Sequence, residues 1–289
     1  MTHTSPADVG AVASVWRYPV KSMIGEELPF AYVSNYGLFG DRSYAIVDQT
    51  DGKTATAKNP RTWPTLFTFK ATCVQTVDSA EKVPPVRITL PNGTTVTSEQ
   101  PELNQVLSEV LNREVCLLTV EQGKVKGVQS SLPPFWSGRS DEYWPDIEGR
   151  DHRNITTEFT LPTGTFFDAA TIHLLTTATL SQLREHYPSG HFAIQRFRPN
   201  IVVEPKKEKG EFVENSWIGH TLAIGNEVRL TITGSCGRCV MTTLPQGALP
   251  KDPGILRTAL QYNDGNVGVY ANVIRGGTIR QGDGIRVEP

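Results

Sequence analysis

The 289-residue sequence contains little cysteine, little net charge and no long apolar run. Four cysteines in a chain of this length do not make a disulfide framework, so we expect a reducing, cytoplasmic environment. No apolar run approaches the roughly 20 residues that span a bilayer, and the N-terminus lacks the features of a secretory signal. A net charge of −2 predicts no general affinity for nucleic acid. We therefore expect no membrane association and no nucleic-acid partner.

Short apolar segments separated by turn residues make up most of the first 120 residues. Alternation and β-branching predict strands at 12–18, 28–33, 43–48, 54–58, 66–73, 86–90, 94–97 and 115–119. Asp51-Gly52 and Asn92-Gly93 mark hairpin turns. One helix is expected over 102–112, where the apolar residues share a single face. Many short strands at this spacing are typical of a barrel or a sandwich.

The last 120 residues have the same character. Strands are expected at 201–204, 217–224, 227–233, 240–243 and in three closing segments between 267 and 287. Thr177 is expected to cap a helix that runs to about Tyr187, and Asp252 to cap a second one. We predict a mainly β fold with a few helices, in which a barrel of residues 1–120 precedes a barrel of residues 166–289.

Residues 121–165 are expected to form an irregular connection, because glycine and proline punctuate them. Their aromatic residues, among them Phe135, Trp136, Tyr143 and Trp144, exceed what a solvated linker keeps. Two interpretations stay open. The segment either covers a site as a lid or packs as a crossover between the barrels.

Cys236 and Cys239 form a Cys-x-x-Cys pair after an expected strand, with Arg238 between them. A zinc site requires more ligands than this pair, and Cys73 and Cys116 are distant in sequence. A thioredoxin-like dithiol opens a helix, which the following β-branched residues disfavour. Two interpretations then remain. Either one thiolate binds a soft metal while Arg238 keeps its surroundings positive, or both cysteines are buried and inert.

Several polar residues at strand ends are candidates for binding an anion. They are Lys21 and Ser22 after the first strand, Arg42 at the start of another, and the group Arg196, Arg198 and Asn200. The two arginines at 196 and 198 are expected to point the same way. Each feature also fits a solvated turn or a structural ion pair, and His173 fits a hydrogen-bonded core histidine.

Taken in order, these motifs resemble those of the MOSC proteins, named after the molybdenum cofactor sulfurase C-terminal domain. The resemblance rests on five stretches and extends over nearly the whole chain: Tyr18–Ser22, Gly40–Arg42, Arg196–Asn200, Gly234–Thr243 and Gly277–Asp283. The relatives in this family include the mitochondrial amidoxime-reducing component and its bacterial counterparts. The resemblance implies that a MOSC N-terminal β-barrel and a MOSC barrel together hold a molybdenum–molybdopterin cofactor.

By this resemblance, Cys239 is the molybdenum ligand and the catalytic residue, and Cys236 lies behind it. The cofactor's phosphate and pterin would be held by residues from both halves: Lys21, Ser22, Arg42, Asp168, Arg196, Arg198, Asn200 and Arg238. Two stretches differ from the relatives, which often have Val-Asp-Pro at 244–246 and hydroxyl residues in place of Ala169 and Ala170. The family also has an association with pyridoxal phosphate.

The implied activity is the reduction of small N-hydroxylated or N-oxide substrates. The chain has no Cys-x₄-Cys-x₂-Cys run for an iron–sulfur cluster, so electrons are expected from a separate ferredoxin- or cytochrome b5-type protein. A second hypothesis is a carrier that holds the cofactor, or sulfur as a Cys239 persulfide, without turnover of its own. A third is a member that has lost the cofactor and binds another ligand.

Overall fold

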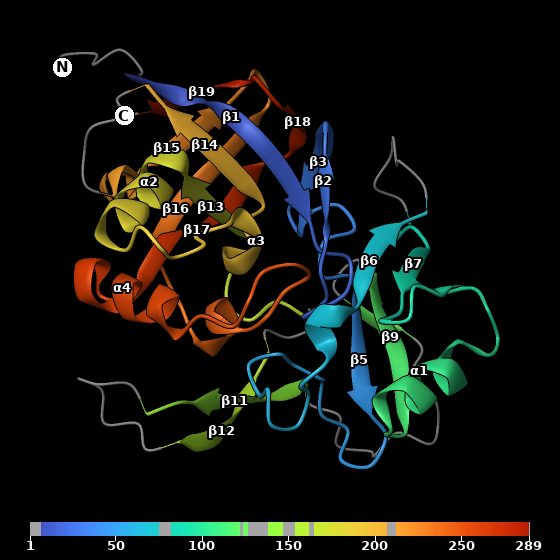
Figure 1. The fold of residues 1–289 in the computed structure, drawn as a ribbon. Coiled ribbons are helices and arrows are strands. Elements are labelled where there is room, and N and C mark those ends of the chain that lie inside the picture. Colours follow the sequence, from blue (N-terminus) through green and yellow to red (C-terminus); the bar gives the residue numbers. More distant parts are fainter. Residues whose placement is uncertain are drawn as a thin grey trace.

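The computed structural model contains a closed seven-stranded β-barrel and describes residues 7–74, 82–121, 124–126, 138–146, 154–161, 165–206 and 212–288. The strands, in order around the barrel, are β14 (Ile201–Pro205), β13 (Ile172–Thr176), β17 (Asn266–Arg275), β16 (Val228–Gly237), β15 (Thr221–Ile224), β19 (Gly284–Glu288) and β1 (Ala7–Arg17). Pairing of β1 with β14 closes the ring. The N-terminal strand therefore completes a barrel whose other strands come from the second half of the chain (Figure 1).

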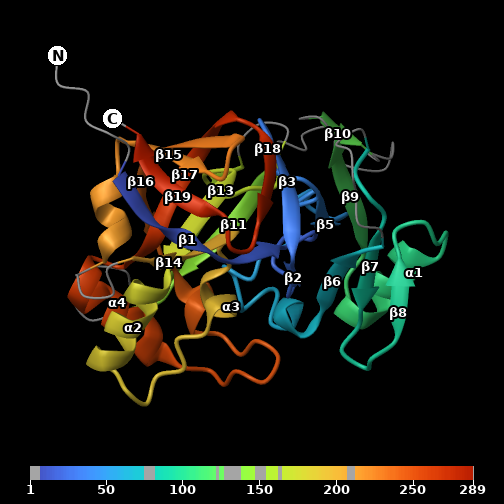
Figure 2. The same cartoon turned by 90° about the horizontal axis from the view of Figure 1, so that it is seen from above.

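Alternation of the side chains explains why these segments close around one core. Along β15 and β16, Leu222, Ile224, Leu230 and Ile232 point inward and are buried together. All pairs around the ring are antiparallel except β13–β14, which is parallel. The helices α2 (Thr177–His186) and α4 (Pro253–Asn263) pack on the side of the barrel away from α1 (Leu103–Leu111), as both ribbon views show (Figures 1 and 2).

The first half of the chain forms smaller sheets beside the barrel (Figure 2). One contains β5 (Tyr44–Asp48), β9 (Val115–Glu121) and β10 (Lys124–Lys126), and another β6 (Lys70–Cys73), β7 (Val86–Thr89) and β8 (Thr95–Thr97). The third joins β3 (Phe30–Ser34) and β4 (Gly37–Leu38) to β18 (Gly277–Arg280). The short strand β2 (Glu26–Leu28) pairs with β1. The mainly β class is confirmed, whereas the division into 1–120 and 166–289 stays a prediction.

Threonine explains most of the local differences from expectation. Val240–Thr243 was expected to be extended but forms the 3-10 turn η3, because the hydroxyls of Thr242 and Thr243 donate to the carbonyls of Cys239 and Val240 at 3.0 and 2.8 Å. The expected strand 66–73 begins with the 3-10 turn η1 (Leu66–Thr68), in which Thr68 donates to the Thr65 carbonyl. A further 3-10 turn, η2, spans Val213–Trp217.

Helix ends and one strand also differ. Helix α2 is capped by Thr176, not Thr177, since the Thr176 hydroxyl accepts from the amide of Thr179. The N-cap expected at Asp252 is confirmed, and so is the helix expected at 102–112. Residues 54–58 do not form a strand: only Thr54 forms isolated bridges, to Val47 and Ser140, and the amide of Ala57 donates to the Ser22 hydroxyl.

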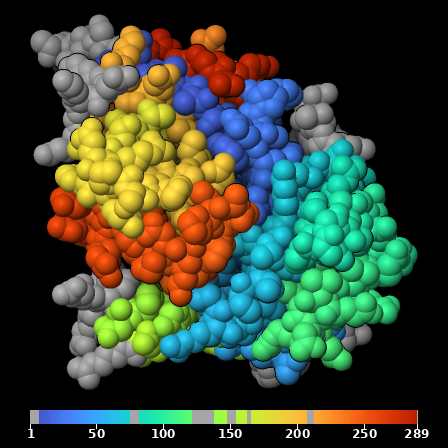
Figure 3. All heavy atoms as spheres, in the orientation of Figure 1, coloured from blue at the N-terminus to red at the C-terminus, as the bar shows by residue number. Residues whose placement is uncertain are grey.

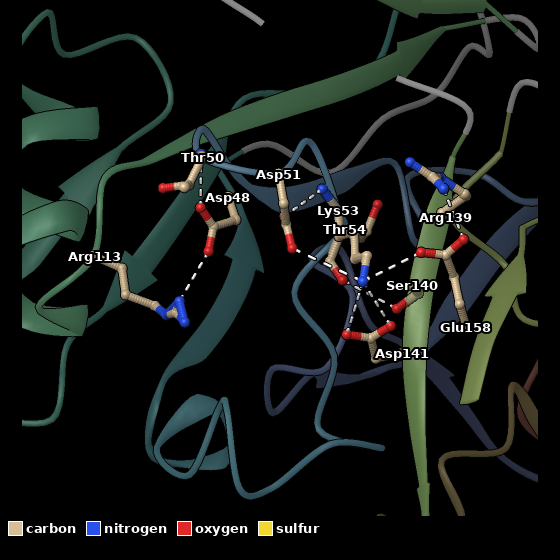
Figure 4. A network of polar contacts seen from close by, with 10 residues as sticks. All are labelled: Asp48, Thr50, Asp51, Lys53, Thr54, Arg113, Arg139, Ser140, Asp141 and Glu158. Atoms are coloured by element: carbon tan, nitrogen blue, oxygen red, sulfur yellow. Dashed lines mark hydrogen bonds and ion pairs between the residues drawn. The ribbon is translucent and has the colours of Figure 1, made fainter. Parts of the chain in front are cut away.

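Within 121–165, where an irregular connection was expected, the structure contains a β-hairpin of β11 (Arg139–Trp144) and β12 (Ile155–Thr160). Lys53 anchors it, with Nζ 3.2 Å from both Asp141 Oδ1 and Glu158 Oε2 (Figure 4). The Ser140 hydroxyl donates to the Thr54 carbonyl at 3.0 Å. Phe135 and Trp136 lie outside the described residues, so the choice between lid and crossover stays open for them. No helix of the described residues is long and apolar enough to cross a membrane.

A substitution at Gly10 tests how tightly the strands pack where the barrel closes. Gly10 pairs with Pro205 on β14 and with Ile285 on β19, and a Cβ atom there would lie 2.3 Å from the Glu204 carbonyl oxygen. Gly10→Ala should therefore lower the free energy of unfolding by about 1–3 kcal/mol, the usual range for overpacking. Gly234, on β16, serves as the control, because a Cβ atom added there would meet no neighbouring side chain or strand within 4 Å. Urea unfolding of Gly10→Ala and Gly234→Ala compares them, and equal stability of the two variants would contradict the tight closure.

Candidate functional site

A cavity of about 360 Å³ lies between the barrel and the sheets of the first half. Its walls come from the loops after β1 and before β5, from the strand β11, from the loop 166–170 and from the strand ends around Cys239. The lining residues are Lys21, Ser22, Arg42, Lys58, Glu142, Trp144, Phe166, Phe167, Asp168, Ala169, Ala170, His173, Phe197, Arg198, Asn200, Gly237, Arg238, Cys239, Met241, Asp264, Asn266 and Tyr270. The cavity thus draws on segments that are far apart in the sequence.

Backbone strain is concentrated at this cavity. Seven described residues other than glycine have positive φ, and four of them line the cavity: Ser22, Arg42, Arg198 and Asp264, with φ between 46° and 62°. Left-handed backbone is unfavourable for residues with a Cβ atom and persists where the surrounding structure imposes it. Clustering of such residues in one cavity is typical of a functional site.

Two arginines from different halves of the chain, the buried Arg198 and the half-buried Arg42, contact the ring of Tyr18. The guanidinium groups of Arg42 and Arg198 lie 4.6 and 4.2 Å from the centre of the Tyr18 ring. Asp41 is the adjacent anion: it pairs with Arg42 and accepts from the Asn200 amide at 2.9 Å. Burial and the charge of Arg42 lower the pKa of Arg198 to about 9. A further anion beside this pair would relieve the repulsion.

Side chains of alternating charge lie next to one another along the cavity lining. Lys21 pairs with Asp168, and Lys58 Nζ lies 3.5 Å from both Asp168 Oδ2 and Glu142 Oε2. Burial alone would raise the pKa of Asp168, but Lys21 and Lys58 outweigh it and hold the pKa well below its usual value. Burial lowers the pKa of Lys21, which Asp168 opposes. These ion pairs connect the first half of the chain to β11 and to the loop 166–170.

Cys236 is the ionised thiol of the pair. It is fully buried, and Arg238 Nη1 donates to its Sγ atom at 2.7 Å. Burial raises the pKa of Cys236, but the Arg238 guanidinium and the nearby His173 outweigh it and bring that pKa to about 6. Arg238 was expected to favour a thiolate in this neighbourhood, and the thiolate that it contacts is Cys236.

Cys239 lies at the cavity wall, immediately before η3, and is partly exposed. Burial raises the pKa of its thiol, and Lys58 and Arg238 offset this only in part. No group of three or more potential metal ligands occurs among the described residues, so a metal at this position would rely on Cys239 and on ligands from elsewhere.

The cavity brings together all but one of the residues that the resemblance assigns to the cofactor and the metal, while Cys236 lies outside its lining. Arg196 is the exception: it is fully buried and donates to the carbonyls of Thr242, Leu244 and Pro250 at 2.7–3.1 Å. The expectation that Arg196 and Arg198 point the same way is wrong, because residues 194–197 form the short helix α3 and Arg198 ends it in a left-handed conformation. The two side chains therefore diverge.

His173 is the buried, hydrogen-bonded histidine expected from the sequence, with Nε2 2.9 Å from the Val267 carbonyl, and it also borders the cavity. Other lining residues were not anticipated, notably Lys58, Glu142, Asp264 and Tyr270, whereas Trp144 belongs to the aromatic segment expected either to cover a site or to pack as a crossover. Lys58 lay in an expected strand and Glu142 in an expected loop, so neither stood out by its spacing. Only the three-dimensional arrangement identifies them.

The donor set fits a phosphorylated ligand with a thiolate-bound metal. Five lining residues are cationic and three are anionic: Lys21, Arg42, Lys58, Arg198 and Arg238 against Glu142, Asp168 and Asp264. The buried Nε of Arg238 has no hydrogen-bond partner within the described part of the chain. Buried donors of this kind require an acceptor, which a bound anion supplies.

The unequal pKa values of the two cysteines give a second test. In metal-free protein, ultraviolet thiolate absorbance should appear as the pH rises through about 6. It should be lost in Cys236→Ser and kept in Cys116→Ser, because burial raises the pKa of Cys116 to about 11. The depressed pKa also means that the free energy of unfolding declines as the pH falls from 9 towards 6, a component absent from Cys236→Ser. A titration that Cys239→Ser removes and Cys236→Ser leaves intact would contradict this assignment.

Comparisons with known proteins agree with the arrangement. The family model of the MOSC N-terminal beta barrel domain matches residues 9–100, and that of the MOSC domain matches residues 162–286. Mitochondrial amidoxime-reducing component 1 from Mus musculus is 27% identical over 246 residues, which cover 82% of this chain and 66% of the mouse protein.

Among solved structures, the YuaD protein from Bacillus subtilis aligns over 98% of this chain and 97% of its own, at 12% identity and a TM-score of 0.47. YiiM from Escherichia coli aligns over 41% of this chain and 54% of its own, at 13% identity and a TM-score of 0.31. Because both family models match in their expected order and the mouse relative aligns across both, this chain belongs to the MOSC domain proteins.

Proposed function

We propose that the cavity holds a molybdenum–molybdopterin cofactor and that the protein reduces small N-hydroxylated or N-oxide substrates. The observation that carries this is the meeting of a partly exposed thiol, Cys239, with a cluster of cations, of which Lys21 and Arg198 are buried, in one strained cavity. The relative named as an amidoxime-reducing component supports the substrate class.

Arg42 and Arg198 are the proposed phosphate-binding pair. Their guanidinium groups are held over the Tyr18 ring, and Arg42 also donates to the Arg198 carbonyl at 3.2 Å. Planar guanidinium groups suit the bidentate recognition of phosphate. A phosphate here would favour the charged form of Arg198, whose pKa is lowered by burial and then by the charge of Arg42. Lys21 and Ser22 would complete this side, with Asn200, already bonded to Asp41, fixing the geometry.

Cys239 is the proposed metal ligand. Because burial raises the pKa of its thiol, binding of a metal must release a proton from Cys239 and is favoured at higher pH. Arg238 and the Cys236 thiolate form a neutral pair behind it, so a second anionic sulfur need not compete for the metal. When bound, the cofactor would supply the two-electron redox chemistry that reduction of an N-oxygenated substrate requires.

The chain's own groups would shape the rest of the reaction. Reduction of an N–OH group to N–H and water consumes two electrons and two protons. Lys58 and Glu142 form an ion pair at the same cavity wall and can orient a polar substrate, and Trp144 and Phe167 give the wall apolar surface that limits water. The electrons would come from a separate ferredoxin- or cytochrome b5-type protein. The family's association with pyridoxal phosphate and the cytoplasmic location stay predictions.

Turnover tests the proposed activity. Protein purified from a host that makes the cofactor should reduce an amidoxime or a hydroxylaminopurine with a chemical reductant. Cys239→Ala should lose molybdenum and activity while its unfolding curve is little changed, whereas Cys236→Ala should keep most of its metal. Elemental analysis and product chromatography measure the two effects.

The outcomes separate the candidate functions. Bound cofactor without turnover of any N-oxygenated substrate would favour the carrier hypothesis. Equal loss of molybdenum in Cys239→Ala and Cys236→Ala would replace the single ligand by a shared dithiol site. Cys116→Ala, a buried cysteine outside the cavity, controls for a general effect of removing a thiol.

The phosphate-binding pair gives a separate prediction. Arg198→Gln and Lys21→Gln should each weaken cofactor retention by about 1.5–3 kcal/mol, the range for hydrogen bonds to charged groups. Arg229→Gln is the matched control, since Arg229 pairs with Glu288 at 2.7 Å outside the cavity. Pterin content after gel filtration measures retention, and unchanged content in both cavity variants would exclude this phosphate site.

A further inference from the structure

A second cavity, of about 570 Å³, shares two walls with the first. On β11, Glu142 and Trp144 line the first cavity, whereas Tyr143 lines the second. This alternation follows from the two-residue period of a strand. Around η3 the same division recurs, with Cys239 on one side and Val240 on the other. The two cavities are therefore back to back.

Prolines dominate the apolar surface of this second cavity, which we call the proline pocket. It is lined by Pro60, Arg61, Pro64, Tyr143, Pro145, Asp146, Val240, Thr243, Leu244, Pro245, Lys251, Pro253, Leu256 and Arg257. Proline offers no amide donor and has a fixed φ, so its surface is apolar and rigid. The loop 60–64, the hairpin β11–β12 and the segment 240–257 meet on the face shown in Figure 3.

Cations outnumber anions at the proline pocket. Arg61, Lys251 and Arg257 line it, against the single acid Asp146. Arg61 is positioned by Tyr143, with its guanidinium 4.2 Å from the ring centre and Nη2 3.1 Å from the hydroxyl. Within the described ranges, none of the three cations forms an ion pair with a carboxylate. This positive charge is the feature that an anionic ligand would recognise.

We propose that the proline pocket binds a small organic anion with a flat apolar body, of the aryl carboxylate or aryl sulfonate class. Its volume lies in the range of small-molecule sites, about 300–1,000 Å³. Apolar walls take up the body, and Lys251, just before α4, and Arg257, within α4, receive the anionic group. A concave, rigid pocket suits a small molecule better than the flat contact of a protein partner.

A ligand bound in the proline pocket would also restrain the segment that carries Cys239. Val240 and Leu244 belong to the same short turn as the cysteine and line the pocket. A ligand that packs against them restrains the segment carrying the thiol. This coupling needs no metal and does not depend on the proposed function.

Two matched fluorescent probes test the proposal on metal-free protein. The anionic probe is 1-anilinonaphthalene-8-sulfonate, and the neutral one is N-phenyl-1-naphthylamine. Wild type should bind the anionic probe saturably, and the double variant Lys251→Gln/Arg257→Gln should weaken that binding by about tenfold or more. Its affinity for the neutral probe should be unchanged. Arg229→Gln, a surface arginine outside both cavities, should bind both probes like wild type.

Three outcomes would overturn the assignment. Equal affinity of wild type and the double variant for the anionic probe would show that the cations do not act. Binding that Arg198→Gln removes and the double variant retains would assign the anion to the first cavity. Binding of an acidic protein, with no saturable binding of the small anion, would make this face a protein-docking surface. Slower modification of Cys239 by a thiol reagent when the anionic probe is bound would support the coupling.

Discussion

Pairing of β1 with β14 is the contact on which the site depends. It closes the barrel, with Val15 opposite Ile201, and the Trp16 amide donates to the Asn200 carbonyl at 2.8 Å. Because β1 then leaves the barrel, the chain delivers Lys21 and Ser22 to the cavity next to Arg198. The first strand is therefore both a part of the barrel core and the means by which the two halves of the site meet.

Charge balance is the second constraint. Bringing the half-buried Arg42 close to the buried Arg198 is unfavourable, and Asp41 offsets only part of the repulsion. The left-handed backbone of both arginines adds to the strain. A structure that holds two such groups against one ring is preorganised for an anion. In the Cys236–Arg238 pair, by contrast, the charges are opposite. The thiolate and the guanidinium neutralise each other, which leaves Cys239 as the available sulfur.

Much of this could be predicted from sequence, and the failures have physical causes. Hairpin signals such as Asn92-Gly93, the helix at 102–112 and most of the strands are local properties, so the class of fold was predictable. The motifs around Lys21, Arg42, Arg198 and Cys239 identified residues that the fold does bring into one cavity. Arg196 differs because a single turn of helix sends it into the interior. Lys58 and Glu142 were missed because their partners are far away in sequence, and the closing role of β1 is likewise a long-range pairing.

The central claim is that one cavity, completed by both halves of the chain, holds a phosphorylated molybdenum cofactor. The most direct measurement is the molar ratio of molybdenum, pterin and protein in a sample purified from a cofactor-producing host. We expect equimolar molybdenum and pterin. Protein without either, from a host in which a control molybdoenzyme is fully loaded, would contradict it.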